Sequence, residues 1–149
     1  MSSPCVIDAC VAAKWWLDDE QYIAEAAHIL KSIRGGGIEP AVPGLWFYEL
    51  ANVIIQAHRK KRLTKHQAEE FIFEIQAMPV LVFPVHENLA RMADLATQYS
   101  ISAYDAAYLA LAESLGCNFL TADDSLFNSI GGKCHFVHHL REAQDLFGV

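Results

Sequence analysis

Short apolar runs and longer stretches of helical periodicity alternate along the whole chain. Five runs of four or five residues are typical of buried strands, namely CVID (5–8), IEPAV (38–42), VLVF (80–83), NFLTA (118–122) and CHFV (134–137). Between them, apolar residues recur every three or four positions, which predicts helices over 12–17, 22–33, 43–61, 64–78, 86–99 and 102–115. This alternation predicts an α/β fold, with a central parallel sheet of about five strands covered by helices on both faces.

Residues with special backbone preferences mark several of these boundaries. Pro43 suits the first position of a helix, because the missing N–H would have no partner there in any case. Thr64 is placed to cap the following helix, and Gly116 to end the helix that starts near Ser102. That last helix, SAYDAAYLALAESLG, is apolar on nearly every side apart from Asp105, so we expect it to lie buried in the core.

The composition fits a single globular domain over residues 1–149, with no repeat or long linker. No apolar segment reaches the roughly 20 residues that a membrane helix needs, and MSSPCVID lacks a signal-peptide pattern, so a cytoplasmic location is expected. The four scattered cysteines are expected to be free thiols rather than disulfides. A net charge of −7 opposes binding of nucleic acid by overall attraction, so a local basic patch or a bound metal would have to supply it.

Three aspartates follow predicted strands or begin predicted helices. Asp8 ends the first strand, Asp123 follows the fourth, and Asp105 lies in the first turn of the buried helix. In open parallel sheets, sites form at the carboxyl ends of the strands, so we expect these carboxylates to lie near one another. An alternative stays open for each, because Asp8 and Asp123 can serve as helix N-caps, and Ser102 with Asp105 has the spacing of a capping box.

Glu49, on the predicted helix over 43–61, is a fourth candidate. It shares a polar stripe with Asn52, Gln56 and Arg59, which is either an ordinary solvated face or a groove leading away from the acids. Four converging carboxylates repel one another and favour a cation, and hard oxygen ligands without His or Cys suit Mg²⁺ or Mn²⁺. Such an ion activates water and stabilises charge on a phosphate, so the acids predict metal-dependent hydrolysis of a phosphodiester.

Four segments in order, VIDACVAAKWWL, YELAN, SAYDAAYLALAESLG and FLTADD, carry a resemblance to a known family. Together they resemble the signatures of PIN-domain ribonucleases, and most closely those of the VapC type, the toxins of bacterial and archaeal toxin–antitoxin pairs. The resemblance covers nearly the whole chain. It implies a Mg²⁺- or Mn²⁺-dependent endoribonuclease that cleaves RNA, forms a homodimer and is covered by a VapB-type antitoxin, often with a basic antitoxin side chain among the acids.

Position by position, the resemblance also implies which residues form the site. The catalytic, metal-binding acids would be Asp8, Glu49, Asp105 and Asp123. The polar residues around them would be Cys10, Asn52, Thr121 and Asp124. Cys10 stands where many relatives carry serine, and a thiol is a weaker hydrogen-bond donor than a hydroxyl. Asp124 can equally cap the short helix that follows, and which acid acts as general base stays open.

Other interpretations remain open. The chain can be a PIN-domain nuclease in RNA processing without an antitoxin, or a non-catalytic module whose acidic groove binds a basic partner. The run of Arg59, Lys60, Lys61 and Arg62 is either an RNA-binding phosphate track or a solvated helix end. CHFVHH (134–139) permits a zinc site, but it lacks a Cys-x-x-Cys pair and alternates between two faces of a strand, so histidines at a solvent-exposed edge are preferred.

Overall fold

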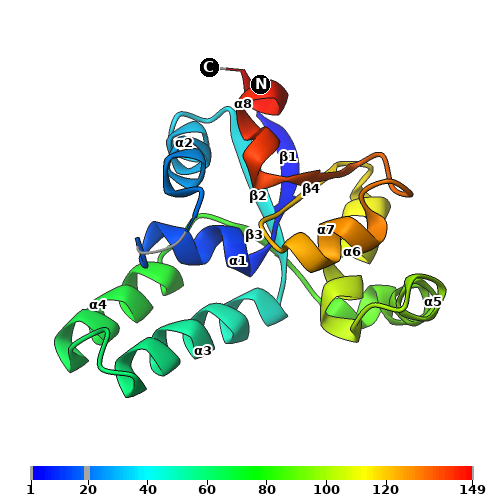
Figure 1. The fold of residues 1–149 in the computed structure, drawn as a ribbon. Coiled ribbons are helices and arrows are strands. Elements are labelled where there is room, and N and C mark those ends of the chain that lie inside the picture. Colours follow the sequence, from blue (N-terminus) through cyan, green and yellow to red (C-terminus); the bar gives the residue numbers. More distant parts are fainter. Residues whose placement is uncertain (1, 19–20, 149) are drawn as a thin grey trace.

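Five parallel strands form one sheet in the order β3-β2-β1-β4-β5 in the computed structural model of the chain (Figure 1). The structure describes residues 2–18 and 21–148. The strands are β1 (Ser3–Ile7), β2 (Ile38–Pro43), β3 (Leu81–Phe83), β4 (Asn118–Thr121) and β5 (Val137–His139). The first strand is central and pairs with β2 on one side and β4 on the other. The predicted α/β fold with a five-stranded parallel sheet is confirmed.

Helices cover both faces of this sheet. The α-helices are α1 (Ala9–Ala12), α2 (Ile23–Arg34), α3 (Leu45–Arg59), α4 (Lys65–Gln76), α5 (Leu89–Tyr99), α6 (Ala103–Leu115), α7 (Asp124–Ile130) and α8 (Ala143–Phe147), and the 3₁₀ helices are η1 (Ala13–Trp15), η2 (Val85–Asn88) and η3 (Leu140–Glu142). Cys5 and Ile7 of β1 pack in one core with Ile29 of α2, whereas Val6 packs in the other with Trp46 of α3. This alternation between two cores is what a strand buried on both faces requires.

Helix α6 is the buried helix that its sequence predicted. Residues 106–112 are all buried, and the hydroxyl of Ser102 accepts the backbone N–H of Asp105 at 3.0 Å to cap the first turn. Gly116 ends the helix with φ at +62°, a left-handed conformation that glycine adopts without a steric penalty. Thr64 caps α4 with a complete capping box, as expected.

The start of α3 differs from the prediction. Pro43 is the last residue of β2, paired with Phe83 of β3, and the helix begins at Leu45. The missing N–H of Pro43 does not break the sheet, because the N–H of Gly44 makes the bond to the Phe83 carbonyl at 3.1 Å. The prediction of Pro43 as the first helical residue is therefore wrong.

The last strand is also displaced from its predicted position. It covers Val137–His139 rather than 134–137. The N–H of Cys134 still bonds to the Ile130 carbonyl at 2.9 Å, in the turn that follows α7. Residues 134–136 thus form a turn between α7 and β5, closed by the bond from the N–H of Val137 to the Cys134 carbonyl at 3.1 Å.

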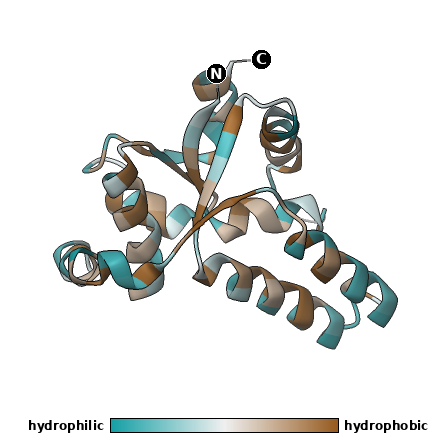
Figure 2. Cartoon of the chain, turned by 180° about the vertical axis from the view of Figure 1, so that it is seen from behind, coloured by the Kyte–Doolittle hydropathy of each residue, from teal (hydrophilic) through white to brown (hydrophobic). Residues whose placement is uncertain are grey.

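Helices α3 and α4 form a pair that extends away from the sheet (Figure 1), and hydrophilic residues gather at its outer end (Figure 2). All four cysteines are free thiols, as expected. Within the described part of the chain, no helix combines the length and the apolar character needed to cross a bilayer.

Candidate active site

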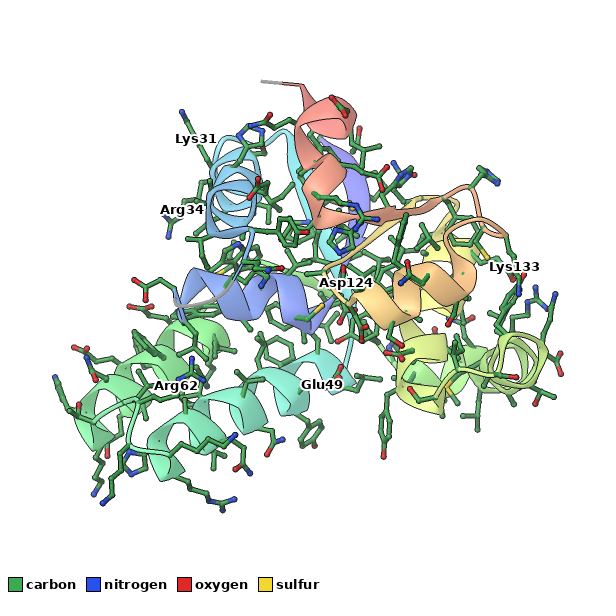
Figure 3. The ribbon with its side chains drawn as sticks, viewed as in Figure 1. Lys31, Arg34, Glu49, Arg62, Asp124 and Lys133 are labelled. Atoms are coloured by element: carbon green, nitrogen blue, oxygen red, sulfur yellow. The ribbon has the colours of Figure 1, made fainter. Side chains whose placement is uncertain are left out.

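Strand ends and helix starts meet at one edge of the sheet. Strands β1 and β4 are parallel neighbours, and Asp8 follows β1 directly while Asp123 comes two residues after β4. Glu49 lies in α3, which follows β2, and Asp105 lies in the first turn of α6. Figure 3 shows Glu49 near the start of α3, below the end of α7 that carries Asp124. These four acids (Asp8, Glu49, Asp105 and Asp123) are called the acid cluster below.

Asp8 is buried, with 6% of its surface exposed. Its Oδ2 accepts a hydrogen bond from the Thr121 hydroxyl at 2.8 Å, and its Oδ1 lies 3.5 Å from the backbone nitrogen of Cys10. The Thr121 Oγ1 in turn accepts the N–H of Asp123 at 3.1 Å. The threonine hydroxyl therefore connects the two acids that follow the strands.

Asp8 and Asp123 are also helix N-caps, the alternative considered for both. Asp123 Oδ1 accepts the N–H of Leu126 at 3.0 Å at the start of α7, and Asp8 caps α1 through the 3.5 Å contact of its Oδ1. Asp105 differs, because the hydroxyl of Ser102 is the cap of α6. Capping therefore accounts for one oxygen of Asp8 and one of Asp123. The Asp105 carboxylate does not cap α6, but the side chain of Ser102 is near it and lowers its pKa.

Burial and mutual repulsion raise the pKa of three of these acids. The pKa of Asp8 rises from 3.8 to about 7, chiefly because the carboxylate is buried and further because Glu49 and Asp105 are close, while the hydrogen bond from Thr121 opposes the rise. Burial likewise raises the pKa of Glu49, with a further contribution from the Asp105 charge. Burial and then the charge of Asp123 raise the pKa of Asp105. Each acid of the cluster thus acts electrostatically on at least one other.

The acid cluster offers only carboxylate oxygens, the donors that Mg²⁺ and Mn²⁺ prefer. A divalent cation beside them would offset the repulsion that raises their pKa values. Across residues 2–18 and 21–148, no group of three or more His, Cys, Asp or Glu side chains already stands close enough to hold a metal ion. This holds for the acid cluster and for the 134–139 segment considered for zinc. The donor chemistry of the acid cluster fits a hard divalent cation.

Cys10 lies where it can support the strand-end acids. Its Sγ accepts the N–H of Ala122 at 3.3 Å and lies 3.6 Å from Thr121 Oγ1. Burial, and then the charge of Asp8, hold the pKa of this thiol well above its ordinary value, so it stays neutral. Asn52, by contrast, is exposed on α3, and in the described part of the chain no hydrogen bond or ion pair joins it to the acids.

Asp124 turns away from the acid cluster toward the last strand. Its Oδ1 lies 2.8 Å from Nε2 of His139 and 3.7 Å from a guanidinium nitrogen of Arg141. The cap of α7 is Asp123, so the alternative that Asp124 caps this helix is wrong. His139 is fully buried, and its Nδ1 accepts the N–H of Arg141 at 3.0 Å, so in the neutral ring Nε2 carries the proton. The expectation of a solvent-exposed histidine is wrong for His139.

Two residues at this edge were not predicted to take part. The hydroxyl of Tyr108 donates to Oε1 of Glu49 at 2.6 Å. Its position three residues after Asp105 on one helix is a signal that sequence analysis could have used, because such pairs share a face. His139 pairs in register with Thr121. This pairing of β5 with β4 depends on the strand order of the sheet, which the hydrophobic periodicity of the sequence does not reveal.

The basic run lies at the far end of the helix that carries Glu49. Arg59, Lys60, Lys61 and Arg62 are all exposed, and Figure 3 shows Arg62 in the turn between α3 and α4. Along a helix axis, the ten positions from Glu49 to Arg59 span about 15 Å. The basic run is therefore separate from the acid cluster and is connected to it by one face of α3.

One family model, described as the PIN domain, matches residues 5–133. The chain belongs to the PIN domain family. Among solved structures, this PIN domain is similar to PAE2754 from Pyrobaculum aerophilum, at 21% identity and a TM-score of 0.68, over 97% of this chain and 88% of that one. It is similar to VapC20 from Mycobacterium tuberculosis, at 13% identity and a TM-score of 0.65, over 85% and 95%. A toxin–antitoxin complex from Klebsiella pneumoniae matches at 18% identity and a TM-score of 0.62, over 91% and 97%. At these low identities, the structural matches show a shared fold. No curated protein sequence matches.

Proposed function

We propose that this PIN domain is a metal-dependent endoribonuclease and the toxin of a VapBC-type toxin–antitoxin pair. The observation that carries the proposal is the acid cluster, in which burial and like charge raise the pKa of Asp8 to about 7 and also raise the pKa values of Glu49 and Asp105. Proteins retain such a costly arrangement where a cation or a reaction uses it.

Three similar structures support the choice of substrate and partner. The Mycobacterium tuberculosis VapC20 is described as a toxin that cleaves the sarcin–ricin loop, and the Klebsiella pneumoniae structure as a toxin–antitoxin complex. A third match, VapBC2 from Rickettsia felis, was solved bound to a fragment of its promoter DNA. By analogy, RNA is the substrate proposed for this chain and a VapB-type antitoxin its partner. The homodimer is proposed from the sequence resemblance alone.

The residues of the cluster would have distinct tasks. Asp8, Glu49, Asp105 and Asp123 would hold Mg²⁺ or Mn²⁺, which when bound lowers the pKa of water and neutralises charge on the attacked phosphate. The Thr121 hydroxyl keeps one oxygen of Asp8 in place and receives the N–H of Asp123. The general base is proposed to be one of the four acids.

The basic run would bind the RNA backbone outside the cluster. Its four cations are exposed, and the first of them, Arg59, lies about 15 Å from Glu49 along α3. Because the overall charge is −7, this local patch would supply the attraction that the whole chain does not.

The test is cleavage of a structured RNA by the purified chain with Mg²⁺, with Mn²⁺ and with excess EDTA. We expect cleavage with either ion and none in EDTA, and we expect Asp8→Asn and Asp123→Asn to lose at least a hundredfold in rate. Asp145→Asn, which removes an exposed acid of α8, is the matched control and should cleave normally. Full activity in EDTA would refute the metal dependence, and binding of RNA without cleavage under every condition would favour a non-catalytic module.

A further inference from the structure

A buried tyrosine hydroxyl joins the two helices that carry Asp105 and Glu49. Tyr108 of α6 is fully buried, and its hydroxyl donates to Oε1 of Glu49 on α3 at 2.6 Å. The backbone N–H of Ala9, the first residue of α1 and the neighbour of Asp8, is near the same hydroxyl and lowers its pKa. The hydroxyl therefore connects α6 to α3 beside the start of α1, and Asp105 lies three residues before Tyr108 on α6.

The direction of these hydrogen bonds is fixed by their chemistry. A phenol has one proton and an ionised carboxylate can only accept, so the Tyr108 proton faces the carboxylate of Glu49. Burial, and then the charges of Asp8 and Glu49, raise the pKa of Tyr108 far above its ordinary value, so the hydroxyl keeps that proton. Glu49 is thus held as an acceptor through Oε1.

The ring that carries the hydroxyl is itself held by the core. Tyr108 stacks on Phe119 of β4, with ring centroids 5.7 Å apart and planes 11° from parallel. Both side chains are fully buried. Glu49 is only half-buried and has a flexible side chain, whose rotamers water can stabilise when no partner restricts them. The core therefore holds the Tyr108 hydroxyl in place, and the hydroxyl restricts the rotamer of Glu49.

We propose that Tyr108 is a positioning residue that orients the Glu49 carboxylate toward the acid cluster. The proposal rests on the proposed function, in which Glu49 holds a divalent cation. Groups that hydrogen-bond metal ligands typically change metal affinity by 10-fold to 100-fold when they are removed. Tyr108 would act in this way without touching the metal or the RNA.

The deciding variant is Tyr108→Phe, which removes the hydroxyl and keeps the stacked ring. We expect Mn²⁺ affinity, measured by calorimetry without RNA, to fall by about tenfold. We expect kcat at saturating Mn²⁺ to fall at least as much, while KM for the RNA changes by less than about twofold, because the RNA does not contact Tyr108. Tyr99→Phe is the control, since it also removes a tyrosine hydroxyl, from a ring at the end of α5 that contacts Lys133, and it should leave both values unchanged.

A second background separates positioning from general stability. In Glu49→Gln, where no carboxylate remains to be oriented, adding Tyr108→Phe should cost no further Mn²⁺ affinity. An equal loss in both backgrounds, or wild-type affinity and kcat in Tyr108→Phe, would overturn the proposal. A crystal structure of metal-free Tyr108→Phe should show Glu49 in more than one rotamer, and an unchanged single rotamer would also overturn it.

These outcomes are distinguishable from failure of the proposed function. A wild-type chain that binds Mn²⁺ and does not cleave RNA refutes the nuclease and still tests Tyr108 by affinity and by rotamer. If the wild type and Tyr108→Phe cleave RNA equally well, the positioning role alone is refuted. In the unmodified chain, proton NMR should detect a slowly exchanging Tyr108 hydroxyl that shifts in Glu49→Gln, and its absence would contradict the hydrogen bond itself.

Discussion

Replacing Asp8 with asparagine should stabilise the metal-free protein at neutral and alkaline pH. Folding raises the pKa of Asp8 from 3.8 to about 7, chiefly by burial. Between these values the folded state binds a proton that the unfolded chain has released, so stability falls as pH rises from about 4 and the loss is complete above about pH 7. At about 1.4 kcal/mol per pH unit, the charged Asp8 costs the folded state about 4 kcal/mol at pH 8.

Asparagine keeps what stabilises the fold at this position. Its amide oxygen can accept from the Thr121 hydroxyl, and asparagine caps a helix about as well as aspartate does. What it loses is the charge. We therefore expect Asp8→Asn to be more stable than the wild type by about 2–4 kcal/mol at pH 8 in EDTA, and nearly equal to it at pH 4, where the wild-type carboxyl is protonated.

The assay is urea unfolding of the wild type, Asp8→Asn and the control Asp145→Asn between pH 4 and pH 8 in EDTA. Excess Mn²⁺ should reverse the order at pH 8, because a ligand that binds only the folded wild type adds stability to that protein. If Asp8→Asn were less stable than the wild type at pH 8 in EDTA, or if their difference did not change with pH, the account of a buried and repelled carboxylate would be refuted.

Three further predictions concern Asp105, the basic run and Cys10. Asp105→Asn should keep or gain stability in EDTA, lose most of the stabilisation by Mn²⁺ and lose RNA cleavage. A variant that is less stable, still stabilised by the metal and still active would show that Asp105 serves the helix start alone. The double variant Arg59→Glu with Lys60→Glu should weaken RNA binding and leave Mn²⁺ affinity unchanged. The slope of log affinity against log salt should fall by about 0.7 for each lost phosphate contact, and an unchanged slope would identify a solvated helix end. Cys10→Ser should keep kcat/KM within about threefold, because a hydroxyl can also accept the Ala122 N–H, and a loss of more than tenfold would show that the thiol is required.

The sequence predicted those parts of the structure that local rules control. Helix α6 has an apolar sequence on every side, a Ser102 cap and a Gly116 end, and no other element has to be known to place it. The strand ends of β1 and β4 follow from short apolar runs that stop at Asp8 and Asp123. Because parallel strands end at one edge, proximity of these two acids could be inferred before the strand order was known.

Long-range packing controls what the sequence did not predict. His139 is buried because β5 joins β4 at the sheet edge and Asp124 and Phe127 of α7 lie against its ring, and none of this is encoded within the run CHFVHH. Pro43 satisfies the rules for a helix start equally well as for a strand end. The pairing of Pro43 with Phe83 decided between them, and that pairing joins residues 40 positions apart.

From the sequence, Asp8 and Asp123 could each be a helix N-cap or an acid of the site. In the structure each of them is an N-cap and also lies in the acid cluster. An N-cap lies at the start of a helix, and in a parallel sheet the start of a helix lies beside the end of the preceding strand, where sites form. Asp8 uses Oδ1 toward α1 and Oδ2 toward Thr121, and Asp123 uses Oδ1 toward α7. Capping fixes the rotamer of a carboxylate and so directs its second oxygen. For this reason substitution by asparagine is more informative than substitution by alanine, since it removes the charge of the acid and leaves the cap that holds it in place.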